Sequence, residues 1–124
     1  MEGLSILSDI HVHTLFDTGA SHSFIASALV DTLDLKPDMV HESTLVSNPV
    51  GGSTYLSMIC RNLSLLFRRV VFSCDAYVLG FSGYGLILGM DWISRYGVVL
   101  DCDIRIVRLR IDGGHDLVVS PIFF

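Results

Sequence analysis

Residues 15–21, Leu-Phe-Asp-Thr-Gly-Ala-Ser, place an acidic residue directly after two apolar ones and a glycine two residues later. The pattern predicts a strand that ends at Asp17 and turns sharply, because Gly19 permits a backbone geometry or a close approach that a Cβ would block. A carboxylate beside an apolar core is costly unless it has partners. Asp17 is therefore either satisfied by local hydrogen bonds or kept at the strand end for chemistry.

The composition limits the class of protein. The 124 residues suit one domain, with a core expected from about residue 3 to 110 and a tail at 111–124. Apolar residues make up 51% and charged residues 17%, so a small core leaves apolar side chains over for a self-interface or a lined groove. The net charge of −5 argues against a nucleic-acid partner. No membrane partner is expected, because no run approaches the roughly 18 apolar residues of a span.

The cysteines are odd in number and form no CxxC pair. A disulfide framework is therefore not expected, and reduced thiols in an intracellular, cytoplasmic setting are the simplest interpretation. Because each cysteine lies in an apolar, strand-like run, we expect Cys60, Cys74 and Cys102 all to be buried.

Short apolar runs separated by turn residues predict a mainly β chain. The expected strands cover residues 3–7, 10–16, 22–25, 39–47, 54–67, 70–79, 86–88, 98–100, 104–111 and 117–119. Helical spacing predicts a short helix at residues 26–33. A second short helix is expected at residues 90–96, with Asp91 in its first turn, where a negative charge suits the helix dipole, and Gly97 at its end. Gly51 and Gly52 mark a tight hairpin tip, which is either a surface turn or a lid over a groove. The sum fits a small closed or semi-closed barrel.

Asp17 is the remaining catalytic candidate once other arrangements are weighed. His11 and His13 share one strand face and could chelate a metal, but no third ligand has a clear place, so we expect neither a metal nor a cofactor. Ser21 and His22 would point to opposite faces of an extended segment, which argues against a Ser-His dyad.

Peptide hydrolysis by carboxylates needs two of them. A close pair shares one proton, so that one member acts as base on a water while the other polarises the scissile carbonyl. Because Asp-Thr-Gly occurs once in the chain, the second carboxylate must come from a second copy related by a two-fold axis.

Two motifs, in order, resemble the protease domain of gypsy-type LTR retrotransposons, especially those of plants, and related retropepsin-like domains. They are LFDTGASHSFI at residues 15–25 and ILGMDW at residues 87–92, with the glycine-tipped hairpin between them. The resemblance covers about residues 3–109. It implies a small closed retropepsin-like acid-protease barrel with a flap hairpin and two short helices. It further implies a homodimeric aspartic endopeptidase that hydrolyses a retroelement polyprotein.

The resemblance also implies roles for the first motif. Asp17 would be the catalytic acid/base, and Thr18 would hydrogen-bond across the dimer axis to brace the two loops. Gly19 would let the loop approach water and substrate, and its amide would hold the carboxylate. Ala20 matches the retroviral type of loop, and Ser21 would support the loop or contact the substrate backbone.

The remaining roles fall on the hairpin and the second motif. The flap would consist of Val50, Gly51, Gly52 and Ser53. The element that passes under the catalytic loop would consist of Ile87, Leu88 and Gly89.

The sequence departs from the retroviral pattern at one ion pair. Retroviral proteases commonly carry an arginine just after this glycine, paired with an acidic residue near the catalytic loop. Here Met90 and Ser21 stand at those positions, so other contacts must hold a dimer. Two alternatives stay open. One is a catalytically silent retropepsin-like dimerisation or binding module. The other is a generic β-barrel ligand-binding domain, which would leave both motifs to coincidence.

Overall fold

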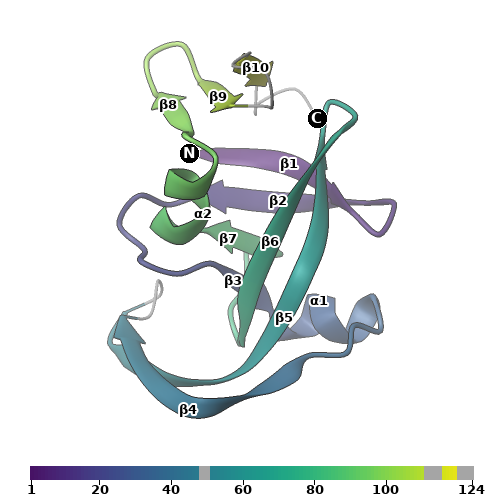
Figure 1. Ribbon diagram of the computed structural model, residues 1–124, viewed down its shortest axis with the longest axis vertical. Coiled ribbons are helices and arrows are strands. Elements are labelled where there is room, and N and C mark those ends of the chain that lie inside the picture. The colour runs from purple at the N-terminus through teal and green to yellow at the C-terminus, as the bar shows by residue number, and fades with distance from the viewer. Residues whose placement is uncertain (48–50, 111–115, 120–124) are drawn as a thin grey trace.

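The computed structural model describes residues 1–47, 51–110 and 116–119 and confirms a mainly β chain with two short helices (Figure 1). The strands are β1 (Glu2–Leu7), β2 (Ile10–Phe16), β3 (Phe24–Ala26), β4 (Asp38–Ser47), β5 (Ser53–Phe67), β6 (Val70–Leu79), β7 (Leu86–Leu88), β8 (Val99–Asp101), β9 (Ile106–Arg110) and β10 (Asp116–Val119). The helices are α1 (Ser27–Thr32) and α2 (Met90–Arg95). Most boundaries lie within one or two residues of those that the sequence predicts.

Six strands close into a barrel. Their order is β1-β2-β7-β3-β6-β5, and the ring closes where Ile6 and Leu7 of β1 pair with Leu66 and Leu65 of β5. Strand β4 pairs with β5 outside this ring, so β4 and β5 extend from the barrel as a long hairpin (Figure 1). Closure leaves the barrel strands without an open edge, as the small closed barrel of the sequence analysis requires.

The barrel interior is filled by side chains that alternate along the strands. On β2, Val12 and Phe16 point inward and are 3% and 2% exposed. Trp92 of α2 packs beside them, with its ring centroid 6.2 Å from that of Phe16 and 5.8 Å from that of Phe67. Burial of such large apolar side chains contributes about 1.5–3 kcal/mol each, so α2 is held firmly against one end of the barrel.

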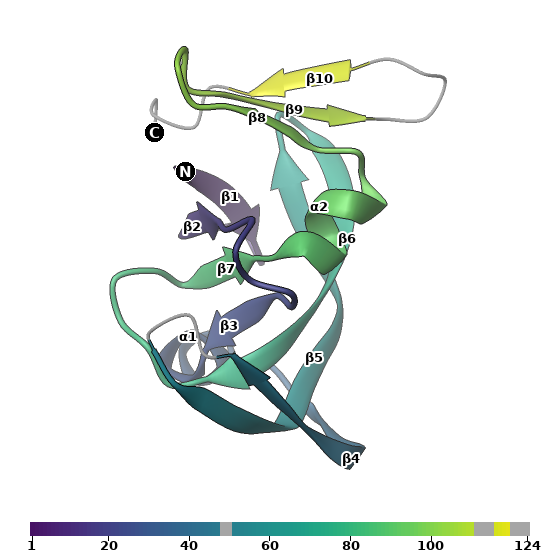
Figure 2. The ribbon, with the colours of Figure 1, turned by 90° about the vertical axis from the view of Figure 1, so that its left-hand side faces the viewer.

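Strand β7 lies between two strands that are joined by the Asp17 loop. It runs parallel to β2, with Phe16 opposite Leu88, and antiparallel to β3, with Phe24 opposite Ile87. The connection from β2 to β3 therefore passes over the end of β7, where α2 begins (Figure 2). This topology brings the two sequence motifs together.

A separate three-stranded sheet, β10-β9-β8, lies beyond α2 (Figure 2). Its inner face carries Val107 and Leu109, both fully buried against the barrel core. The Arg68 side chain, from the turn between β5 and β6, donates a hydrogen bond of 2.7 Å to the carbonyl of Val118 and ties this sheet to the barrel. The strands predicted at residues 98–100 and 104–111 correspond to β8 and β9, which pair as an antiparallel hairpin.

The prediction that all three cysteines are buried is wrong for one of them. Cys60 and Cys74 are buried in β5 and β6, and burial raises the pKa of both thiols, that of Cys74 to about 12. Cys102 is exposed, because it lies in the turn between β8 and β9, which projects from the molecule. Across the residues that the structure describes, no helix is long and apolar enough to cross a membrane.

Candidate active site

The Asp17 carboxylate has a local partner and also faces solvent. Its Oδ1 atom accepts a hydrogen bond of 2.9 Å from the backbone N–H of Gly19, and Ala20 N–H donates to the Asp17 carbonyl at 3.2 Å. The residue is half-buried, whereas Thr18 and Gly19 are exposed. The two interpretations of Asp17 given by the sequence, local hydrogen bonding and a chemical role, are therefore compatible. A local hydrogen bond satisfies one oxygen, and the carboxylate remains accessible for chemistry.

The second motif supports this loop from below. The Asp17 N–H donates to the Leu88 carbonyl at 2.9 Å, and the Met90 N–H donates to the Ala20 carbonyl at 2.7 Å. Gly89 lies between these two residues and is buried. The backbone around it is packed so tightly that an added Cβ would lie 2.3 Å from the His22 carbonyl oxygen. With φ at −95°, Gly89 is needed for space and not for backbone conformation. Asp17, Ala20, Leu88 and Gly89 thus meet at one place in the fold.

The β4–β5 hairpin packs on the same region. Its inner face carries Val46 and Leu56, which are 7% and 1% exposed and join Ala20, Phe24 and Ile87 in a second apolar cluster. The ends of β4 and β5 beside the turn lie on the same side of the molecule as the β2–β3 connection (Figure 2). The hairpin thus covers the apolar floor next to the Asp17 loop.

Three of the four predicted flap residues, Gly51, Gly52 and Ser53, lie at the described end of this hairpin. Gly51 and Gly52 are exposed with φ of 112° and 75°, values that favour glycine. Ser53 begins β5 and pairs with Ser47. Val50 lies outside the described residues.

The expectation that Ser21 and His22 point apart is wrong. Ser21 Oγ and His22 Nδ1 are 2.8 Å apart, and the imidazole packs edge-on against the Tyr77 ring with centroids 5.6 Å apart. The reason is local: residues 21–22 bend, and β3 starts at Phe24 instead of at His22. Within the described ranges His22 forms no ion pair with a carboxylate, which a Ser-His-Asp relay would need.

One contact between the two motifs was not predicted from the sequence. The buried Ser23 hydroxyl donates a hydrogen bond of 2.7 Å to the Asp91 carboxylate, across 68 residues of chain. Both residues stand inside the quoted motifs, and a small polar residue next to the apolar Phe24 and Ile25 was the available signal. From the sequence alone, Asp91 has only the role of an acidic residue in the first turn of a helix.

The histidines of β2 do not assemble a metal site in the structure. His11 and His13 are exposed on one face of the strand, as expected, and His13 Nε2 lies 3.7 Å from a Glu2 carboxylate oxygen. The hydroxyl of Tyr84 also donates to Glu2, and that hydrogen bond raises the pKa of Tyr84. In the described part of the chain, no group of three His, Cys, Asp or Glu side chains is arranged to hold a metal ion.

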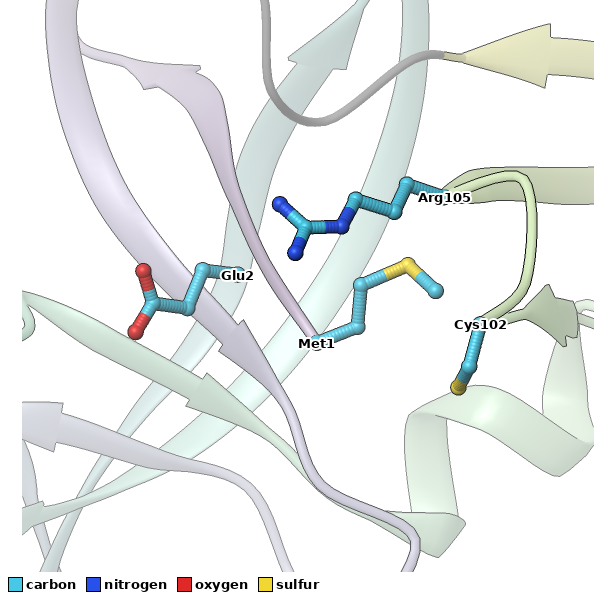
Figure 3. Close-up of a pocket in the computed structure, with 4 residues that line it drawn as sticks. All are labelled: Met1, Glu2, Cys102 and Arg105. Atoms are coloured by element: carbon cyan, nitrogen blue, oxygen red, sulfur yellow. The ribbon is translucent and has the colours of Figure 1, made fainter.

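A pocket of about 420 Å³ is lined by residues outside the two motifs (Figure 3). It is lined by Met1, Glu2, Cys102 and Arg105, and the Arg105 side chain extends toward the space between Met1 and Glu2. The Met1 backbone exchanges two hydrogen bonds with Phe16, so the pocket lies near the base of the Asp17 loop. It contains none of the candidate catalytic residues.

Comparisons with known proteins agree with this geometry. A family model described as retroviral aspartyl protease matches residues 1–114. The retroviral protease-like domain of Ddi1 from Leishmania major has a similar structure, with a TM-score of 0.68 and 15% identity over 100% of this chain and 97% of that one. EIAV protease, complexed with the inhibitor HBY-793, gives a TM-score of 0.61 and 17% identity over 82% of this chain and 91% of that one. These two likenesses establish a retropepsin-like fold. No curated protein sequence gives a significant match.

Proposed function

Because the chain belongs to the retroviral aspartyl protease family, we propose that it is an aspartic endopeptidase that works as a homodimer with one Asp17 from each chain. The observation that carries the proposal is the half-buried Asp17 carboxylate, held by the Gly19 amide at 2.9 Å at the end of β2. One such loop per chain supplies one carboxylate, and the reaction needs two.

The two Asp17 side chains would divide the acid and base roles. Two carboxylates that a two-fold axis brings close together would share one proton, as in aspartic proteases generally. The ionised Asp17 removes a proton from water while the water oxygen attacks the scissile carbonyl carbon. The protonated partner's Asp17 donates a hydrogen bond to the carbonyl oxygen. A proton then passes to the amide nitrogen, the C–N bond breaks, and a carboxylic acid and an amine leave.

The surrounding residues support this assignment. Thr18 is exposed beside Asp17, at the place where a residue that braces the partner's loop would stand. The proposed flap over the substrate consists of Val50, Gly51, Gly52 and Ser53, of which the structure describes the last three. Exposed apolar side chains, such as Val99 at 57% and Ile104 at 58%, favour a self-interface.

The substrate we propose is a polypeptide, and specifically the polyprotein of a retroelement. The gypsy-type motif pair at residues 15–25 and 87–92 supports this origin. The apolar cluster under the β4–β5 hairpin would receive apolar side chains of an extended peptide once the hairpin opens.

The test measures cleavage of an unstructured protein across pH, with and without pepstatin, alongside sedimentation of the same sample. Asp17→Asn is the informative variant, because its amide oxygen can still accept the Gly19 hydrogen bond and the fold should persist. We expect it to lose at least about 100-fold in cleavage rate. Asp9→Asn is the matched control, since Asp9 is exposed in the β1–β2 turn at φ of 63°, a conformation that asparagine tolerates.

Two outcomes would contradict the proposal. Cleavage that survives Asp17→Asn would move the site elsewhere. No cleavage at any pH would favour the second candidate, a catalytically silent module, which the Met90 and Ser21 departures from the retroviral ion pair support. A silent dimer would indicate a dimerisation module, and a silent monomer a binding module.

A further inference from the structure

A hydrogen-bonded brace lies directly beneath the Asp17 loop, on residues to which the proposed function assigns no role. It joins Ser23, at the end of the loop, to Asp91, in the first turn of α2. Asp91 Oδ1 accepts from the Ser23 hydroxyl at 2.7 Å and from the Trp92 N–H at 2.8 Å. Asp91 Oδ2 accepts from the Ser23 N–H at 3.2 Å. All three donors point at the two oxygens of one carboxylate, which can accept them together.

The Ser23 hydroxyl links Asp91 to the glycine under the loop. Its oxygen accepts a hydrogen bond of 3.1 Å from the Gly89 N–H while its hydrogen points at Asp91. Ser23 is fully buried, so water does not replace either partner. The carboxylate therefore sets the direction of the hydroxyl, and the hydroxyl holds the Gly89 amide.

Gly89 in turn borders both ends of the Asp17 loop. Its two chain neighbours are tied to that loop, Leu88 through the Asp17 N–H at 2.9 Å and Met90 through the Ala20 carbonyl at 2.7 Å. The space around Gly89 is already filled, because a Cβ there would lie 2.7 Å from the Ala20 carbonyl oxygen. A displacement of Gly89 is therefore transmitted to the backbone that carries Asp17.

We propose that Asp91 is a positioning residue of the active site: through Ser23 it fixes Gly89 and thereby the orientation of the Asp17 carboxylate. The brace spans the same two chain segments as Met90 and Ser21 but uses different residues. This inference rests on the proposed function, because a positioning role has meaning only if Asp17 performs chemistry. Correct placement matters in such a site, since a shift of about 1 Å can cost about 100-fold in rate.

The first test does not depend on activity. Amide hydrogen exchange is measured residue by residue in the unmodified protein and in Ser23→Ala. Because this variant removes the acceptor of the Gly89 N–H, we expect the Gly89 amide to exchange at least about 10-fold faster while barrel amides such as Leu65 keep their protection. Unchanged exchange at Gly89 would overturn the brace.

The second test measures kcat and KM separately for Asp91→Ala. We expect kcat to fall by about 10- to 100-fold with KM changed less than about 3-fold, because the loss concerns the reacting group and not peptide binding. Asp75→Ala is the matched control: Asp75 is also exposed, lines one pocket with Asp91 and accepts a main-chain N–H, that of Asn62 at 2.8 Å, but it does not hydrogen-bond to Ser23. An Asp91→Ala enzyme with the kcat of the Asp75→Ala control would refute the positioning role.

Further variants keep the test decisive. Asp91→Asn can retain the two hydrogen bonds to Oδ1 but turns its NH₂ toward the Ser23 N–H, so its kcat should lie between those of the unmodified enzyme and Asp91→Ala. If Asp91→Ala does not fold, Asp91→Asn and Ser23→Ala carry the test. The double variant Ser23→Ala/Asp91→Ala should lose no more kcat than the more damaged single variant, because both substitutions break one connected unit.

If the unmodified protein cleaves nothing, the proposed function fails, and the exchange experiment still decides whether the brace exists.

Discussion

Replacement of Gly89 by alanine should lower the free energy of unfolding of this protein far more than the same replacement at the exposed Gly80. A Cβ at position 89 would lie 2.3 Å from the His22 carbonyl oxygen and 2.7 Å from the Ala20 carbonyl oxygen. Ordinary van der Waals contact begins at 3.4 Å, so the two segments would have to separate by about 1.1 Å (3.4 − 2.3). Both obstructing atoms belong to the backbone and cannot rotate away.

That separation allows a magnitude to be worked out. It would stretch the hydrogen bonds from Met90 N–H to Ala20 and from Gly89 N–H to Ser23, at about 1 kcal/mol each. Overpacking adds about 1–3 kcal/mol. We expect a total loss of about 3–5 kcal/mol in the free energy of unfolding, which for a domain of this size is roughly 10–20 °C in melting temperature.

Trp92 offers a direct assay. It is the single tryptophan, 3% exposed, and it follows Gly89 by three residues, so its fluorescence reports urea unfolding next to the substitution. Gly80→Ala is the control, because the nearest atom to its Cβ would be Ser27 Oγ at 3.9 Å, and we expect a change within about 0.5 kcal/mol. A Gly89→Ala protein within about 1 kcal/mol of the unmodified one would refute the close passage of β7 beneath the Asp17 loop.

Three further outcomes are expected. Gly19→Ala would bring a Cβ to 3.2 Å from Asp17 Oδ1, so cleavage should fall at least about 10-fold while the urea midpoint moves little; full cleavage activity would contradict this. Since the Cys74 thiol has its pKa raised to about 12 by burial, the folded chain holds this proton above pH 9 while the unfolded chain releases it. Stability should therefore fall as pH rises from 9 to 11, by roughly 1.4 kcal/mol per unit for this group, and the fall should be absent from Cys74→Ala in a pH series of urea titrations. A maleimide should label Cys102 in the native protein and reach Cys60 only after denaturation, as mass spectrometry of the labelled peptides would show.

Much of the fold was predictable because its signals are local. Turn residues such as Ser8 and Asp9 separate alternating runs, so β1 and β2 were identified within a residue or two. The short helix α2 was likewise predicted from local signals, an acidic residue in its first turn and Gly97 after its end. The error on Cys102 has a local cause as well: an apolar run predicted burial, whereas the residue lies in the β8–β9 turn, and sequence pattern does not tell which turns project into solvent.

The sequence by itself determined the Asp17 loop and its single occurrence, and the two ordered motifs indicated the family. These properties reside in contiguous residues, so no three-dimensional information was needed to find them. Only the tertiary structure decided that β7 inserts between β2 and β3, and hence that Ser23 meets Asp91 across 68 residues. Contacts of this kind form when distant strands pair to close the barrel, and neither the alternation of apolar residues nor local propensity encodes which distant residue becomes the partner.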